Sequence, residues 1–391
     1  MSNPSRRSSF LSLLLATLLL TQVGCSREGA SWPTNAGAVI EHYADLVHAN
    51  YADCATQARS MQQAIESFLR RPSVATMQAA RRAWLKARAP YGQTEVFRFY
   101  SGPIDDDDGP EGLLNAWPMD ESYVDGVVGN PNAGIVNDVD NYPKLDEALI
   151  VSLNEQEGEE NISTGYHAIE FLLWGQDLSE TGAGARPFTD YSTAPNAQRR
   201  ASYLRIVTQR LVNDLDHLVN EWKPDADNYR KQFLALPERE AITNIMNGMG
   251  MLSGFELARE RLDVPYQTKL QEDEHSCFSD NTHDDAYRNA QGIQNVFTGE
   301  YAGSDGQRTS GPGVGAFLTE IDADMSTTLS EQIAASVGLA QGLQPPFDRL
   351  IVESNTTGRA SIQALIDALT TQAQSLSEAA TRAGLKINIE E

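Results

Sequence analysis

The chain has 391 residues, of which 30 are Lys or Arg and 54 are Asp or Glu, so its formal net charge is −24. Such a charge repels nucleic acid and anionic lipid head groups, and it attracts cations. The length exceeds what one simple helical core requires, and we therefore expect two domains.

The first 24 residues have the pattern of a secretory signal peptide. Arg6 and Arg7 form a basic segment, and residues 10–20 form an apolar run that is too short to span a membrane. No later stretch reaches about 18 apolar residues, so we expect no transmembrane helix in the mature protein.

The cleavage region is similar to that of a bacterial lipoprotein, because Gly24 precedes Cys25. This similarity implies that Cys25 is the lipidated first residue of the mature protein, with residues 25–35 as a linker. Gln22 stands where such sites usually have Leu, so ordinary signal cleavage is the alternative. We expect a protein of the bacterial cell envelope that faces the periplasm as an outer-membrane lipoprotein and meets the membrane only through its lipid anchor.

The expected N-terminal domain, residues 36–228, contains apolar residues at helical spacing. Pro72 ends the first run, Ser73 can cap the second, and Pro224 closes the last. Residues 100–142 are rich in Gly, Pro, Asn and Asp, but their apolar residues favour an ordered, packed loop. We predict helices over 39–68, 73–96, 145–153, 163–175 and 203–222.

The expected C-terminal domain, residues 229–391, repeats this organisation. We interpret the Gly-rich stretch 299–315 as a connector, and no segment shows the alternation expected of strands. The predicted fold is all-α, with two four-helix-bundle-like domains. Gly165-Tyr166-His167 and Gly254-Phe255-Glu256 are weakly alike, which makes a pseudo-repeat plausible. The predicted helices of this half are 237–262, 284–297, 317–339, 346–352 and 361–383.

The segment from Ser163 to Asp177 is a candidate site, because it carries His167 and Glu170 in an otherwise apolar helix. Positions three apart share one helix face, so the two side chains point the same way. A buried carboxylate is rarely tolerated without a partner. A metal ion is one candidate for that partner, and a hydrogen bond from His167 or an ion pair with Arg98 is the alternative.

The other histidines divide into two groups. We interpret His42, His48 and His217 as polar-face or helix-packing residues. His275 and His283 lie in an acidic segment, 272–285, that could bind a metal or dock against the first domain, although Asp280 or Asn281 could simply cap the next helix. The sequence does not decide whether Cys54 and Cys277 form a disulfide.

Several segments together resemble the imelysin family, also called the M75 peptidase family, and within it the iron-regulated protein A group. Residues 165–170 match the family's G-x-H-x-x-E motif, and the resemblance runs from about Ala36 to near the C-terminus. The further matching segments are Arg98-Phe99-Tyr100-Ser101-Gly102-Pro103-Ile104-Asp105, Gly109-Pro110-Glu111-Gly112, Asn115-Ala116-Trp117-Pro118 and His275-Ser276-Cys277-Phe278-Ser279-Asp280-Asn281-Thr282-His283.

The resemblance implies two helical bundles related by a pseudo-repeat, with the site between them, and an exported bacterial protein associated with iron uptake. It implies His167 and Glu170 as metal ligands. The resemblance and the segments above together make candidate ligands or cleft residues of Arg98, Asp105, Glu256, His275, Asp280 and His283.

Our first hypothesis is a protein that binds iron or another divalent metal and works with iron-uptake components of the envelope. The second is a zinc metallopeptidase of the M75 type, which would need about three protein ligands, a water molecule and a general base. The third is a metal-free module whose cleft binds a peptide or a protein partner.

Overall fold

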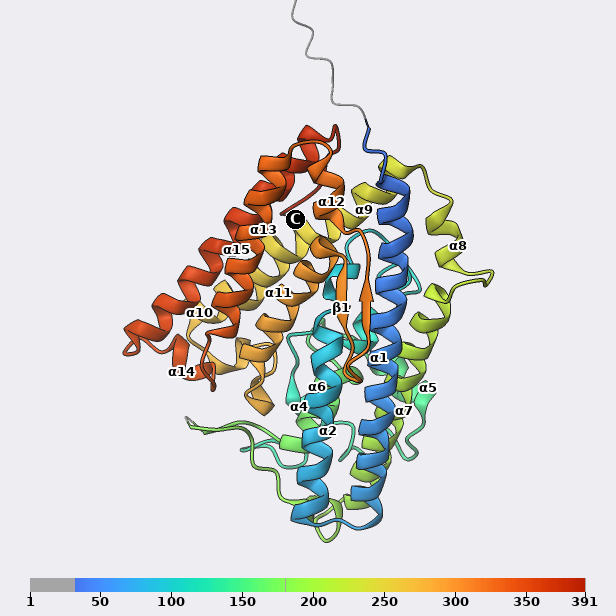
Figure 1. Ribbon diagram of the computed structural model, residues 1–391. Coiled ribbons are helices and arrows are strands. Elements are labelled where there is room, and N and C mark those ends of the chain that lie inside the picture. Colours follow the sequence, from blue (N-terminus) through green and yellow to red (C-terminus); the bar gives the residue numbers. More distant parts are fainter. Residues whose placement is uncertain (1–31, 180, 391) are drawn as a thin grey trace, which may run out of the picture. The chain divides into compact units, whose positions relative to one another are not determined.

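Helices dominate residues 32–179 and 181–390, which are the residues that the computed structural model describes. The signal segment and Cys25 lie outside the described residues. The all-α class is confirmed (Figure 1), and no helix in the described ranges is long and apolar enough to cross a membrane.

A first group of helices packs around α1 (Ala36–Arg70), which contacts both α2 (Val74–Gly92) and α7 (Ala197–Trp222). The buried residues of α1 recur at threes and fours, as predicted, and Ser73 caps α2 by accepting a hydrogen bond from the Thr76 amide. The short helix α6 (Gly165–Trp174) packs against α2 and α7. The smaller elements up to residue 234 are η1 (Glu95–Phe97), α3 (Glu111–Leu114), α4 (Glu121–Val124), α5 (Glu147–Leu153), η2 (Phe188–Tyr191) and α8 (Tyr229–Leu234).

A second group packs around α15 (Thr356–Arg382), which contacts α9 (Glu238–Met251), the π-helix η3 (Leu252–Asp263) and α13 (Ala323–Gln341). Helix α11 (Thr282–Thr298) contacts α13 and η3, and it also contacts α2 and η1 of the first group. The remaining helical elements are α10 (Val264–Thr268), η4 (Gln271–Asp273), η5 (Cys277–Ser279), α12 (Val314–Thr319) and α14 (Asp348–Ile351).

Several local predictions were wrong or incomplete. The single helix predicted over 317–339 is broken at residues 320–322, between α12 and α13, where Asp322 caps α13. The connector at 299–315 contains a two-stranded antiparallel hairpin, β1 (Glu300–Ala302) and β2 (Arg308–Ser310), with Tyr301 opposite Thr309. Strands of three residues are too short to show an alternation in sequence. The loop at 100–142 contains the one-turn helices α3 and α4, and the helix predicted over 237–262 changes from α to π after Met251.

The proposed division between residues 228 and 229, and the pseudo-repeat, stay predictions. The contacts of α2 with α11, and of η1 with α9 and α11, bring elements from both halves of the sequence together. Cys54 and Cys277 are both buried and free, so they form no disulfide.

Candidate functional site

Helix α6 positions the predicted pair, and all ten of its residues are buried. It begins at Gly165, whose φ is +83° and where an added Cβ would lie 2.6 Å from the carbonyl oxygen of Leu114. Only glycine suits both conditions, which explains the first position of the G-x-H-x-x-E pattern. Side chains from outside the helix bind its carbonyl groups, since Trp84 donates to Tyr166 O and Arg81 donates to Leu173 O.

His167 and Glu170 form a hydrogen-bonded pair in the protein interior, and both are 0 % exposed. His167 Nδ1 lies 2.9 Å from Glu170 Oε2. The other carboxyl oxygen, Oε1, accepts hydrogen bonds from the Ser279 amide at 2.9 Å and from Ser279 Oγ at 2.7 Å. The partners of Glu170 are therefore His167 and Ser279, and the alternative of an ion pair with Arg98 was wrong.

Burial sets the protonation of this pair. It raises the pKa of Glu170 to about 8, because the hydrogen bonds from Ser279 and the charge of Arg88 only partly offset desolvation and the nearby Asp285. Burial, with Arg88, holds the pKa of His167 well below its ordinary value. At neutral pH the carboxyl group is therefore mostly protonated and the imidazole is neutral.

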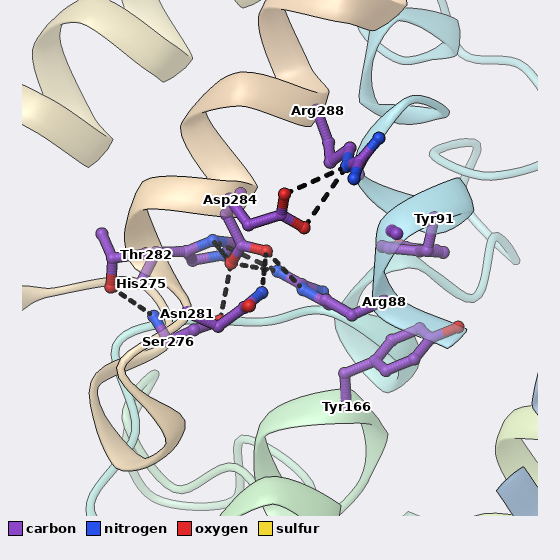
Figure 2. A network of polar contacts seen from close by, with 12 residues as sticks. Arg88, Tyr91, Tyr166, His275, Ser276, Asn281, Thr282, Asp284 and Arg288 are labelled. Atoms are coloured by element: carbon purple, nitrogen blue, oxygen red, sulfur yellow. Dashed lines mark hydrogen bonds and ion pairs between the residues drawn. The ribbon is translucent and has the colours of Figure 1, made fainter. Parts of the chain in front are cut away.

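His275 forms a second imidazole–carboxylate pair with Asp285, which lies in the first turn of α11. Figure 2 shows His275 within the network of polar contacts around Arg88. His275 Nδ1 is 3.1 Å from Asp285 Oδ2, and the same oxygen accepts from Ser276 Oγ at 2.6 Å. Arg88 donates to both oxygens of Asp285, at 3.1 Å each. Although burial opposes ionisation, Arg88 and His275 hold the pKa of Asp285 well below its ordinary value. Burial, followed by Arg261, lowers the pKa of His275 to about 4.

The two imidazole rings meet at Trp117. The ring centroids of His167 and His275 are 4.7 Å apart, and the Trp117 ring lies 4.8 Å from His167 and 6.2 Å from His275. His167 Nε2 is buried and has no hydrogen-bond partner among the described residues. Because a buried polar atom usually has a partner, this nitrogen is the feature of the site that most needs an explanation.

A cavity of about 610 Å³ reaches this cluster, and its wall includes Trp117 and His275. Arginine and glutamate side chains form a network of ion pairs along its wall. Arg261 donates at 2.6 Å to both Glu95 and Glu256, and Arg98 pairs with Glu95 at 2.8 Å. Arg98 also lies 3.2 Å from Glu111 and 3.3 Å from Glu256. The carboxylates of this network are thus occupied by arginines.

Not every residue predicted for the site lies in it. Arg98, Glu256 and His275 line the cavity. Asp105 accepts hydrogen bonds from the amides of Phe99 and Gly102, so it shapes its own loop. His283 Nδ1 lies 3.1 Å from the Asp280 carbonyl oxygen, and neither residue lines the cavity.

Sequence reasoning missed four residues that hold the site together: Arg88, Arg261, Ser279 and Asp285. Glu256 and Arg261 contact each other because η3 is a π-helix, in which residues five apart lie one turn apart. No pattern in the sequence marked that change of helix type. Ser279 and Asp285 lie within the acidic segment 272–285, but nothing local in the sequence pointed to Glu170 and Arg88 as their partners.

Two imidazole rings are the nitrogen donors that this cluster offers to a metal ion. In the described residues, no three His, Cys, Asp or Glu side chains are grouped so as to hold a metal. The available nitrogens are His167 Nε2 and His275 Nε2, since each Nδ1 faces a carboxyl group and no hydrogen bond to His275 Nε2 forms in the described ranges. Two imidazole nitrogens leave further coordination positions to exogenous ligands.

Together, the helical fold and the buried G-x-H-x-x-E helix define a class of all-α proteins with an imidazole–carboxyl pair at the centre. The family model for imelysin, which also bears the designation peptidase M75, matches residues 47–376. The chain belongs to the imelysin family.

Relatives of this chain carry names connected with iron regulation. It is 24 % identical over 351 residues to the iron-regulated protein A of Synechococcus elongatus, covering 85 % of this chain and 84 % of that protein. The solved structure of a proposed iron-regulated protein A precursor from Parabacteroides distasonis has a TM-score of 0.69 at 19 % identity, over 89 % of this chain and 96 % of that one. An imelysin-like protein from Psychrobacter arcticum has a TM-score of 0.66 at 15 % identity, over 90 % and 97 %. The structural likeness establishes the fold.

Proposed function

We propose that this protein binds iron or another divalent metal ion at His167, with His275 as the second nitrogen ligand. The observation that carries the proposal is His167 Nε2, a buried ring nitrogen without a partner beside a carboxyl group whose pKa is raised to about 8. A cation at Nε2 would supply the positive charge that Glu170 lacks. The pair would give up its proton on binding, as expected for a metal ligand that must be deprotonated.

The geometry changes the role that we assign to Glu170. Both of its oxygens are engaged, one by His167 and the other by Ser279. Glu170 is therefore proposed to orient His167 and to raise the basicity of its ring rather than to touch the metal. Asp285 stands in the same relation to His275. Carboxylate–histidine pairs of this kind commonly support metal ligands.

The proposed biological role is iron uptake in a bacterial envelope. The support is the resemblance in sequence to a protein named for iron regulation, together with the imidazole donors, which suit iron as well as zinc. Export through the signal segment, lipidation at Cys25 and cooperation with iron-uptake components complete the proposal.

Metal analysis of the purified mature protein tests the site. We expect about one Fe²⁺ per chain after anaerobic loading, and loss of that metal in His167→Ala. Glu170→Gln should bind 10- to 100-fold more weakly, the range typical of removing an outer-shell partner. His283→Ala removes an imidazole from a nearby segment that does not line the cavity, and it should bind like wild type. Unchanged metal content in His167→Ala would refute the proposal.

The same samples test the peptidase alternative. A metallopeptidase needs a base that accepts a proton from water, and Glu170 is fully buried with both oxygens bonded. We expect no cleavage of unfolded casein by the metal-loaded protein. Cleavage that disappears in Glu170→Gln would restore the peptidase assignment.

A further inference from the structure

Four carboxylates stand at the exposed side of the cavity that leads to His275. They come from separate elements: the turn after α5, the π-helix η3 and the short helix η4. Because Asp273 is half-buried and the other three are exposed, all four can reach solvent. They are Glu155, Glu159, Glu260 and Asp273.

These four differ from the carboxylates deeper in the cavity. Glu111 and Glu256 are paired with Arg98. In the described part of the chain, no hydrogen bond or ion pair forms to the side chains of Glu155, Glu159 or Asp273. Glu260 lies 3.8 Å from Arg259, but both side chains are about half exposed or more, so solvent screens that contact. The exposed side of the cavity therefore carries nearly four uncompensated negative charges.

The buried end of the same cavity points independently to a ligand. His275 is only 3 % exposed, yet it lines the cavity, and its Nε2 has no hydrogen-bond partner among the described residues. Its Nδ1 donates to Asp285 Oδ2 at 3.1 Å, so the ring is held in one orientation. The cavity thus joins a group of free carboxylates to a fixed imidazole whose second nitrogen is available.

We propose that Glu155, Glu159, Glu260 and Asp273 form the access path of the metal site, and that they select the metal as a hydrated cation rather than as an anionic chelate. This inference rests on the proposed function. Clefts lined by charge of one sign concentrate ions of the opposite sign and raise association rates by 10- to 1000-fold. The same field repels a metal that arrives in a polycarboxylate complex.

Stopped-flow binding of hydrated Fe²⁺ under argon tests the access path. The ring centroids of Trp117 and His167 are 4.8 Å apart, so an ion bound at His167 should quench the fluorescence of Trp117. We compare wild type with a variant carrying Glu155→Gln, Glu159→Gln, Glu260→Gln and Asp273→Asn. The control variant removes four acidic side chains that do not line the cavity, and it carries Glu240→Gln, Glu300→Gln, Asp324→Asn and Glu331→Gln.

At 20 mM salt we expect the access-path variant to bind Fe²⁺ at least tenfold more slowly than the control variant, with a similar dissociation rate. The difference should shrink at 500 mM salt, where screening acts over a few ångströms. Equal rates in the two variants, or faster Fe²⁺ binding after neutralisation, would overturn the access path while leaving the metal site standing. If wild type shows no quenching that depends on His167, the proposed function and this inference fail together.

Discussion

The substitution Asp285→Asn tests how much the second imidazole–carboxylate pair depends on buried charge. Asp285 and Arg88 are only 3 % and 2 % exposed, and their guanidinium and carboxylate groups meet at two distances of 3.1 Å. Asparagine keeps the shape of the side chain but leaves the Arg88 charge without its ionic partner. Removing one member of a buried ion pair typically costs 3–5 kcal/mol, so we expect a loss of about 4 kcal/mol in the free energy of unfolding.

The neighbouring residue supplies a matched control. Asp284 pairs with Arg288 on the same helix, but these side chains are 25 % and 27 % exposed (Figure 2). Asp284→Asn should therefore cost less than about 1 kcal/mol. Urea unfolding followed by circular dichroism measures both variants. The double variant Asp285→Asn, Arg88→Met should recover part of the loss, because it no longer buries an unpaired charge. Equal losses for Asp284→Asn and Asp285→Asn would refute the reasoning.

Two further predictions concern stability. Burial alone would raise the pKa of Glu95, but the neighbouring arginines outweigh it and lower the pKa from 4.5 to about 2. This difference contributes about 3 kcal/mol to the free energy of unfolding. The arginines are Arg261, Arg98 and Arg88. Since the pKa is lower in the folded state than in the unfolded state, this stability is present above pH 4.5 and is lost as the pH falls towards 2. In urea titrations between pH 6 and 3, the free energy of unfolding of Glu95→Gln should fall less steeply with pH than that of wild type. The same pH dependence in both proteins would contradict the prediction. Gly165→Ala should cost about 2 kcal/mol or more, because φ is positive and the Leu114 carbonyl group blocks the new methyl group. Gly338→Ala, where the space is open, should instead stabilise helix α13 by up to about 1 kcal/mol. Thermal unfolding measures both variants, and melting temperatures that shift in the same direction would contradict this reasoning.

The long helices could be predicted from sequence because their cores are periodic over many turns. The spacing from Val39 to Phe68 defines one face of α1, and Pro72 with Ser73 defines the next boundary. The same reasoning failed for η3, because a π-helix widens the turn by a single residue without changing which residue types occur. The hairpin at Tyr301 was missed because its strands have only three residues each, too few for an alternation to show in the sequence.

The candidate site was predictable only where its residues are close in sequence. His167 and Glu170 are three apart, so helix geometry alone placed them on one face. Ser279 binds Glu170 across 109 positions and Arg88 binds Asp285 across 197, and no local pattern encodes such contacts. The hydrogen bond with His167 was among the alternatives considered from sequence. The second partner of Glu170 is set by the tertiary fold, and it is Ser279 rather than Arg98.

The two imidazole–carboxyl pairs look alike but differ in charge, and under the proposed function this difference favours His167 over His275 as the principal ligand. Asp285 has Arg88 beside it, so its pKa is low and its negative charge is already balanced. In the described part of the chain, Glu170 has no cation in hydrogen-bond contact, and burial raises its pKa to about 8, so it holds a proton. A cation bound at His167 would let Glu170 release its proton and would balance the carboxylate that forms, a gain that Asp285, already ionised beside Arg88, does not offer. In the proposed site, His167 is therefore the principal ligand, and His275 would complete the site from a pair that Arg88 already neutralises.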